Sequence, residues 1–162
     1  MNRRCPENKL TGLGILRGWK WNINCRGYAN IIGSPGDLVY GLVYEISPSD
    51  EARLDEWEEV PLKYTKHVVR IELQSKNNEE GSVIQSLAYI DERSTEEGEP
   101  REEYVHRINK GVKDAVARGL PKWYIDKYIR RFIPAGEGEQ AVEAFKPKEV
   151  LRNAATTVKP NM

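Results

Sequence analysis

The chain has few of the residues that build disulfide or metal-bound cores. Of its 162 residues, two are cysteines (Cys5 and Cys25) and two are histidines (His67 and His106). The cysteines fit neither a CxxC motif nor a zinc-ligand spacing. With so few imidazoles, the composition also argues against a dedicated metal site. We therefore expect two free thiols, buried or half-buried, and no metal centre.

An excess of charge of one sign and long hydrophobic runs are also missing. Lysine plus arginine equals aspartate plus glutamate, at 25 each, so the formal net charge is zero and no net field would attract nucleic acid or an anionic membrane. The mean hydropathy is −0.67, and no apolar run approaches the ~20 residues that span a bilayer. The first residues show no apolar signal core, which predicts a cytoplasmic protein. The length suits one domain with a single core.

The most distinctive segment is acidic and covers residues 54–61 (LDEWEEVP). The residues before it predict a short helix over 48–57, because Ser47 can act as N-cap, Pro48 suits the first helical position and Asp50 can reach back as in a capping box. Such a helix would place Leu54 and Trp57 on one face.

This helix would deliver Glu58 at its exit, next to the indole of Trp57. A carboxylate beside an aromatic wall is desolvated, which raises its pKa and suits it to proton transfer near neutral pH. The alternative is that these acidic residues only solvate a helix end, and that Trp57 is an ordinary core residue.

The first half of the chain predicts strands. Apolar runs at 10–16 and 19–23, with Gly18 between them, indicate a hairpin. Residues 27–32 predict a further short strand that ends at a turn over 33–37. The nearly unbroken apolar run at 38–46 is typical of a central strand that is covered on both faces.

Alternating residues at 63–73, a polar turn at 76–81 and a run at 82–90 then predict a second hairpin. The last third of the chain changes to helical spacing. One amphipathic helix is expected to end near Gly119, with Ile108, Val112, Ala115 and Val116 on its apolar side. A second begins at Leu120-Pro121 and carries Tyr124 and Tyr128 as core residues, and residues 141–153 predict a partial helix. Strands followed by helices indicate one α+β domain.

Three segments, taken in order, resemble the γ-glutamylcyclotransferases within the wider AIG2-like group. They are residues 29–44 (ANIIGSPGDLVYGLVY), residues 54–60 (LDEWEEV, similar to the family's LDxxEG segment), and Gly119-Leu120-Pro121 with Tyr124. The resemblance covers about residues 1–133 and includes Arg4-Cys5-Pro6. It implies a small mixed β-barrel-like sheet flanked by helices. The expected domain spans 1–135, truncated at its N-terminus relative to the family, with a partly helical or mobile tail over 136–162.

Enzymes that this chain resembles cleave γ-glutamyl amino acids into 5-oxoproline and a free amino acid, without a cofactor or metal, and some are homodimers. The resemblance implies a small-molecule γ-glutamyl substrate and places the proton-transfer glutamate at Glu58. It also matches two substrate-site tyrosines to Tyr89 and Tyr104. The alternatives are a cross-strand packing role for Tyr89 and a surface position at a helix start for Tyr104.

The chain departs from the family pattern at two places. Relatives begin with a strand that ends in Tyr-Gly-Ser-Asn, whose turn supplies backbone N–H donors to the substrate, and this motif does not occur in the sequence. Glu59 stands where the family commonly has glycine, which adds a second carboxylate beside Glu58 or indicates a different backbone. Three functions remain open: a γ-glutamylcyclotransferase that uses Glu58, a non-catalytic binding member of the same fold, and a γ-glutamylamine cyclotransferase.

Overall fold

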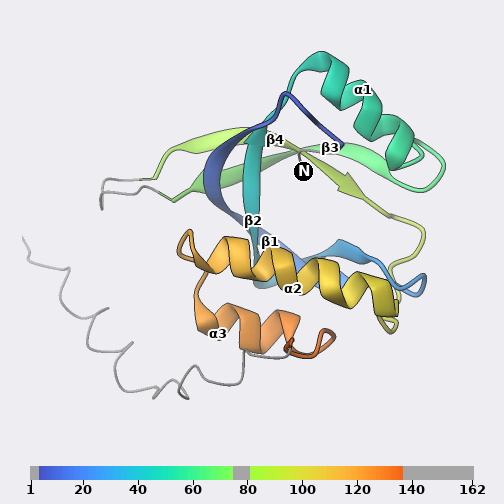
Figure 1. Ribbon diagram of the computed structural model, residues 1–162, viewed down its shortest axis with the longest axis vertical. Helices are drawn as coiled ribbons and strands as arrows, with labels where there is room; N and C mark the ends of the chain where they lie inside the picture. Colours follow the sequence, from blue (N-terminus) through green and yellow to red (C-terminus); the bar gives the residue numbers. More distant parts are fainter. Residues whose placement is uncertain (1–3, 75–80, 137–162) are drawn as a thin grey trace, which may run out of the picture.

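The computed structural model of the protein describes residues 4–74 and 81–136. A four-stranded sheet with the order β2-β1-β3-β4 pairs its strands antiparallel throughout. Helices α2 and α3 lie on one side of this sheet and α1 lies at the opposite side (Figure 1). The predicted α+β class is confirmed. The elements are β1 (Lys9–Ile23), β2 (Ala29–Glu45), α1 (Pro48–Trp57), β3 (Thr65–Leu73), β4 (Val83–Ile90), α2 (Glu102–Val116), α3 (Lys122–Tyr124) and the π-helical turn η1 (Ile125–Ile129).

The predicted break at Gly18 and the predicted turn over 33–37 both fall within long strands, at a bulge where β1 pairs with β2. β1 continues through Gly18, which has a φ of +78°, and its register with β2 shifts between Arg17 and Trp19. Arg17 pairs with Leu38 whereas Trp19 pairs with Gly33, so the intervening residues of β2 loop out. The predicted hairpin at Gly18 is therefore wrong. A bulge bends a strand but lets both halves keep the same partner.

The prediction that residues 38–46 form a central strand is also wrong, because β2 is an edge strand of the described sheet. The expected coverage of both faces is nevertheless present. Leu38, Tyr40 and Leu42 pack against the core beneath the helices. Val39 and Val43 belong to a second apolar cluster, separate from the core beneath the helices. A curled sheet and a helical layer thus bury both faces of an edge strand, which explains the apolar run.

Asn30 joins the two outer strands of the sheet. Its side chain is 4% exposed. The Nδ2 atom donates to the Asp91 carbonyl oxygen at 2.9 Å, and the Asp91 N–H donates back to Oδ1 at 3.0 Å. Asp91 directly follows β4, so an amide side chain bridges the start of β2 and the end of β4. This bridge holds the sheet in the predicted barrel-like curl.

Helix α1 has the predicted bounds and the predicted cap: Ser47 Oγ accepts a hydrogen bond from the Asp50 N–H at 3.2 Å. The Asp50 carboxylate accepts the Glu7 N–H at 3.0 Å, so it attaches the N-terminal segment to the helix. Leu54 is buried. Trp57 is 57% exposed, so it is not a core residue. It is the last residue of the helix, whose buried residues are Asp50 and Leu54.

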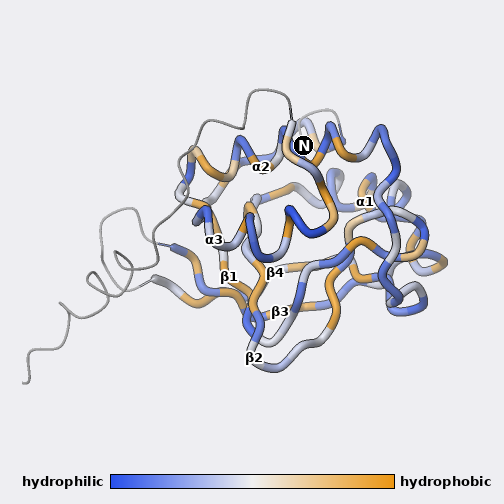
Figure 2. Tube along the Cα trace, turned by 90° about the horizontal axis from the view of Figure 1, so that it is seen from below, coloured by the Kyte–Doolittle hydropathy of each residue, from blue (hydrophilic) through white to orange (hydrophobic). Residues whose placement is uncertain are grey.

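Helices α2 and α3 complete the core. Hydrophobic and hydrophilic positions alternate along α2 (Figure 2). Val112 and Ala115 are buried, but Val116 is 49% exposed, contrary to the prediction. The helix terminates as expected near Gly119, whose φ is +96°. Tyr124 and Tyr128 are buried, which confirms them as core residues. The predicted turn at 76–81, except for Gly81, and the predicted helix at 141–153 lie outside the described residues.

Candidate functional site

A cavity of about 390 Å³ lies where the N-terminal segment, the start of β2, the end of α1, the end of β4 and the first half of α2 meet. All three residues that the sequence singled out contribute to its wall: Glu58, Tyr89 and Tyr104. The other charged and aromatic lining residues, apart from Trp57 and Glu59, were not predicted as site residues from the sequence. These additional residues are Arg4, Arg26, Arg107, Lys63, Tyr28 and Tyr64.

Glu58 is the C-cap of α1, and its N–H donates to the Leu54 carbonyl at 2.8 Å. Its side chain is 24% exposed. Burial raises the pKa of the Glu58 carboxyl, while the positive charges of Arg4, Arg107 and Arg26 act in the opposite direction without cancelling the effect. A carboxyl group with a raised pKa exchanges a proton more readily near neutral pH.

The indole of Trp57, expected to form an aromatic wall beside Glu58, lines the cavity but is 57% exposed. The guanidinium of Arg4 lies over the Trp57 ring, 5.2 Å from its centroid, and Arg4 Nη1 donates to Glu58 Oε1 at 3.3 Å. Trp57 therefore positions a cation at the carboxylate. No local pattern around Arg4 predicts this contact, which depends on the attachment of the N-terminal segment to α1.

Tyr64 and Tyr104 provide the buried aromatic surface. Burial raises the pKa of Tyr64 to about 12 and also raises the pKa of Tyr104, and in both cases the negative charge of Glu58 contributes. Both phenols therefore remain protonated hydrogen-bond donors at neutral pH. The ring of Tyr104 packs edge-on against Tyr28, with 5.4 Å between the centroids. The predicted surface position at a helix start thus does not describe Tyr104, which is partly buried at the cavity.

Tyr89 reaches the cavity from β4, but its hydroxyl already has a partner. It donates to Asp55 Oδ1 at 2.8 Å, and Asp55 Oδ2 accepts from Lys66 Nζ at 2.8 Å. Burial and the hydrogen bond to Asp55 raise the pKa of Tyr89. In this structure, Tyr89 connects β4 to α1. A direct contact of Tyr89 with substrate remains a prediction.

The family's glycine after the glutamate has a backbone explanation in this chain. Glu59 has a φ of +50°, a left-handed conformation that glycine adopts without strain. The Glu59 carboxylate pairs with Lys63. The charges that act most strongly on the pKa of Glu58 belong to arginines, so the expected like-charge effect of Glu59 is not what raises it.

Arg26 is held at the cavity by a buried carboxylate. Its Nη2 donates to Asp91 Oδ2 at 2.6 Å, and its guanidinium lies 5.2 Å from the ring centroid of Tyr64. Burial would raise the pKa of Asp91, but hydrogen bonds from Ser94, Arg26 and Arg93 outweigh it and lower the pKa. The lowered pKa favours the charged form of Asp91, which holds Arg26 in place.

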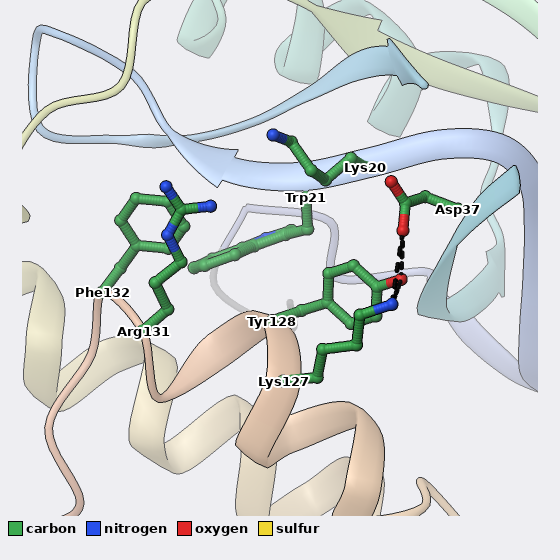
Figure 3. Close-up of a pocket in the computed structure, with 7 residues that line it drawn as sticks. All are labelled: Lys20, Trp21, Asp37, Lys127, Tyr128, Arg131 and Phe132. Atoms are coloured by element: carbon green, nitrogen blue, oxygen red, sulfur yellow. Dashed lines mark hydrogen bonds and ion pairs between the residues drawn. The ribbon is translucent and has the colours of Figure 1, made fainter. Parts of the chain in front are cut away.

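A second cavity, of about 160 Å³, lies between β1, β2 and η1 (Figure 3). Its charged side chains pair with one another or with adjacent residues. The Tyr128 hydroxyl donates to Asp37 and accepts from Lys127 Nζ, and this bond to Tyr128 lowers the pKa of Asp37. Lys20 and Arg131 both pair with Glu97. These contacts attach the last helical turn to the sheet, and the lowered pKa of Asp37 does not suit proton transfer.

Within residues 4–74 and 81–136, no group of three or more His, Cys, Asp or Glu side chains is arranged to hold a metal ion. Cys5 is buried and Cys25 is exposed, and both thiols are free. The expectation for Cys25 was therefore wrong. In the same part of the chain, no helix has the length and apolarity required to span a membrane.

Solved structures share this fold. Uncharacterized protein loc79017 from Homo sapiens is 24% identical, with a TM-score of 0.67 over 94% of this chain and 88% of its own. A gamma-glutamyl cyclotransferase is 22% identical, with a TM-score of 0.66 over 94% and 89%. YkqA from Bacillus subtilis is 20% identical, with a TM-score of 0.65 over 79% and 46%. The fold is thus of the γ-glutamyl cyclotransferase-like class.

The sequence itself identifies the family. The model of the AIG2-like family matches residues 38–128, which is more than half of the chain and includes Glu58, Tyr89 and Tyr104. The protein belongs to the AIG2-like family, as its motifs predicted. A search of curated protein sequences found no match.

Proposed function

We propose that the protein is a γ-glutamylcyclotransferase that converts γ-glutamyl amino acids to 5-oxoproline and a free amino acid, with Glu58 as the single general acid and base. The observation that carries this proposal is the state of Glu58. It is a partly buried carboxyl group with a raised pKa, in a cavity large enough for a small molecule. The structural likeness to a gamma-glutamyl cyclotransferase supports the proposal through the fold.

The reaction requires one bond to form and one to break. The substrate's α-amino nitrogen attacks its own γ-carbonyl carbon, and the proton released from that nitrogen passes to the Glu58 carboxylate. When the tetrahedral intermediate collapses, the amide C–N bond breaks and Glu58 returns the proton to the leaving amine. One carboxyl group serves both steps because the nucleophile is intramolecular and already close to the carbonyl.

The raised pKa of Glu58 matters for the second step. A carboxyl group with an ordinary pKa near 4.3 would return a proton reluctantly at neutral pH. Burial of Glu58 makes the protonated form more accessible. The neutral phenols of Tyr64 and Tyr104 are the donors that we assign to the developing negative charge on the γ-carbonyl oxygen.

The test is release of 5-oxoproline from γ-glutamyl-alanine by the 162-residue chain and by Glu58→Gln. We expect the substitution to lower kcat by about 10²–10⁴-fold, the usual contribution of a general acid or base. Glu56→Gln is the matched control, because Glu56 is an exposed carboxylate of the same helix that does not line the cavity. Equal turnover by Glu58→Gln and the parent, with cooperative unfolding of both, would refute the role of Glu58.

A non-catalytic binding function is the second candidate, and the ion pair between Arg4 and Glu58 favours it. An ion-paired carboxylate is a weaker base than a free one. Turnover that depends on Glu58 would exclude this alternative. Binding of γ-glutamyl-alanine without 5-oxoproline release would establish it.

A further inference from the structure

Three of the four cationic side chains that line the cavity form an ion pair with a carboxylate of the protein. Arg4 pairs with Glu58, Lys63 with Glu59, and Arg26 with Asp91. Arg107 is the exception: within the described residues it has no carboxylate at ion-pair distance. Its guanidinium lies over the ring of Tyr104, 5.3 Å from the centroid. The cavity therefore contains one positive charge that no carboxylate of residues 4–74 and 81–136 pairs with.

Helix α2 explains why Arg107 lies at the cavity. It follows Tyr104 by three residues, so both side chains project from the same face of the helix. Stacking on an aromatic ring uses the face of the guanidinium and leaves its N–H edge available to a planar carboxylate. Arg107 is also close enough to Glu58 to act on its charge. A ligand carboxylate bound to Arg107 would thus lie beside the reacting atoms.

We infer that Arg107 binds the carboxylate of the leaving amino acid, and so selects γ-glutamyl amino acids over γ-glutamyl amines. The inference rests on the proposed function. The reacting atoms of the substrate must meet Glu58, which is mostly buried, whereas Arg107 is exposed. The γ-glutamyl half therefore occupies the inner part of the cavity, and the leaving half extends towards Arg107.

The inner part of the cavity offers a different donor for the substrate's α-carboxylate. Arg26 is fixed by Asp91, and its Nε atom is buried and has no hydrogen-bond partner among the described residues. A buried donor without a partner is costly unless a ligand satisfies it. This division leaves Arg107 for the carboxylate that distinguishes an amino acid from an amine.

Two substrates isolate this contact. Ethylamine is alanine without its carboxylate, so γ-glutamyl-alanine and γ-glutamyl-ethylamide differ only in the group assigned to Arg107. We expect Arg107→Gln to lower kcat/KM for γ-glutamyl-alanine about tenfold, mainly through KM, as for the loss of one charge-assisted hydrogen bond. At a pH well above the acidic limb of the profile, where loss of the Arg107 charge no longer changes the ionisation of Glu58, the ethylamide should change by less than about twofold. Arg107→Lys keeps the charge and should restore part of the loss.

Lys110→Gln is the matched control. It removes one positive charge from an exposed position of the same helix without altering the cavity wall. Neither substrate should be affected by it. An equal loss for both substrates in Arg107→Gln would place Arg107 at a shared part of the substrate and overturn the inference. An unchanged preference between the two substrates would overturn it as well.

A binding measurement separates this inference from the proposed function. In Glu58→Gln, calorimetric titration should show γ-glutamyl-alanine binding about tenfold more tightly than the ethylamide, and Arg107→Gln added to that variant should abolish the difference. A parent protein that releases no 5-oxoproline but shows this binding difference would refute the proposed function and support the inference. Equal binding of the two compounds would refute the inference.

Discussion

Arg4 holds the Glu58 carboxylate at 3.3 Å, and the exposed fractions of their side chains are 32% and 24%. At about this separation, two unit charges interact by about 1 kcal/mol in water and by several kcal/mol at a lower effective dielectric constant. Measured couplings of partly exposed pairs are at most about 1 kcal/mol. We therefore take about 1 kcal/mol as the contribution of Arg4 to stabilising the charged form of Glu58, which corresponds to about 0.7 pH unit.

Arg4→Met removes this charge and keeps an apolar stem over Trp57. Because the positive charge of Arg4 lowers the pKa of Glu58, its removal raises that pKa further. The carboxylate is the form that accepts the substrate's proton, so the acidic limb of the kcat/KM profile should move to higher pH by about 0.7 unit. Rates well above this limb should not fall, since Glu58 would no longer be held in an ion pair.

The assay is the pH dependence of 5-oxoproline release, together with a carbon-13 NMR titration of the glutamate carboxyl groups. Arg17→Met is the control, because it breaks an exposed ion pair with Glu72 between β1 and β3, away from the cavity. A limb that moves to lower pH in Arg4→Met would contradict the electrostatic argument. If the limb did not move at all, Glu58 would not be the group that titrates in the profile.

Two further predictions concern stability. Asn30→Ala should lower the free energy of unfolding by about 2–4 kcal/mol in urea titrations, because the buried N–H and carbonyl of Asp91 both lose a partner; a loss below about 0.5 kcal/mol would show that the bridge does not hold the sheet closed. The pKa of Glu58 is higher in the folded protein than its ordinary value, so its favourable contribution is complete below the unfolded pKa and is lost as pH rises through the folded pKa. The difference in melting temperature between Glu58→Gln and the parent should therefore favour the variant more at about pH 7 than at about pH 4. The opposite order would contradict the direction of the pKa shift.

The candidate site is assembled from segments that are far apart in the sequence. Arg4 reaches Glu58 because the Glu7 N–H is bound by Asp50, which lies near the start of α1. Arg26 is held by Asp91, which follows β4. Both connections involve carboxylates that are themselves buried. The electrostatic environment of Glu58 thus depends on the same contacts that attach the N-terminal segment and close the sheet.

Local signals in the sequence determined the bounds of helix α1 and the position of Glu58 at its end. The cap at Ser47, the proline at the helix start and the spacing of apolar residues fixed α1 at its observed bounds. Helical periodicity likewise identified the buried tyrosines of the last helical turns. The predicted helix bounds placed Glu58 at the end of α1, and the family motif predicted its role in proton transfer. Capping and periodicity act over a few residues, so they leave a direct trace in the sequence.

Only the tertiary structure decided what surrounds Glu58. The edge position of β2 and its continuity through Gly18 depend on strand pairing, which local patterns do not encode. Trp57 could not be assigned to the surface from its helical spacing, because exposure depends on how the helix packs against the rest of the fold. Arg26 and Arg4 carry no local signal, since their positions arise from contacts across the fold. Burial and charge at a site are sums over these distant neighbours, and those sums exist only once the chain has folded.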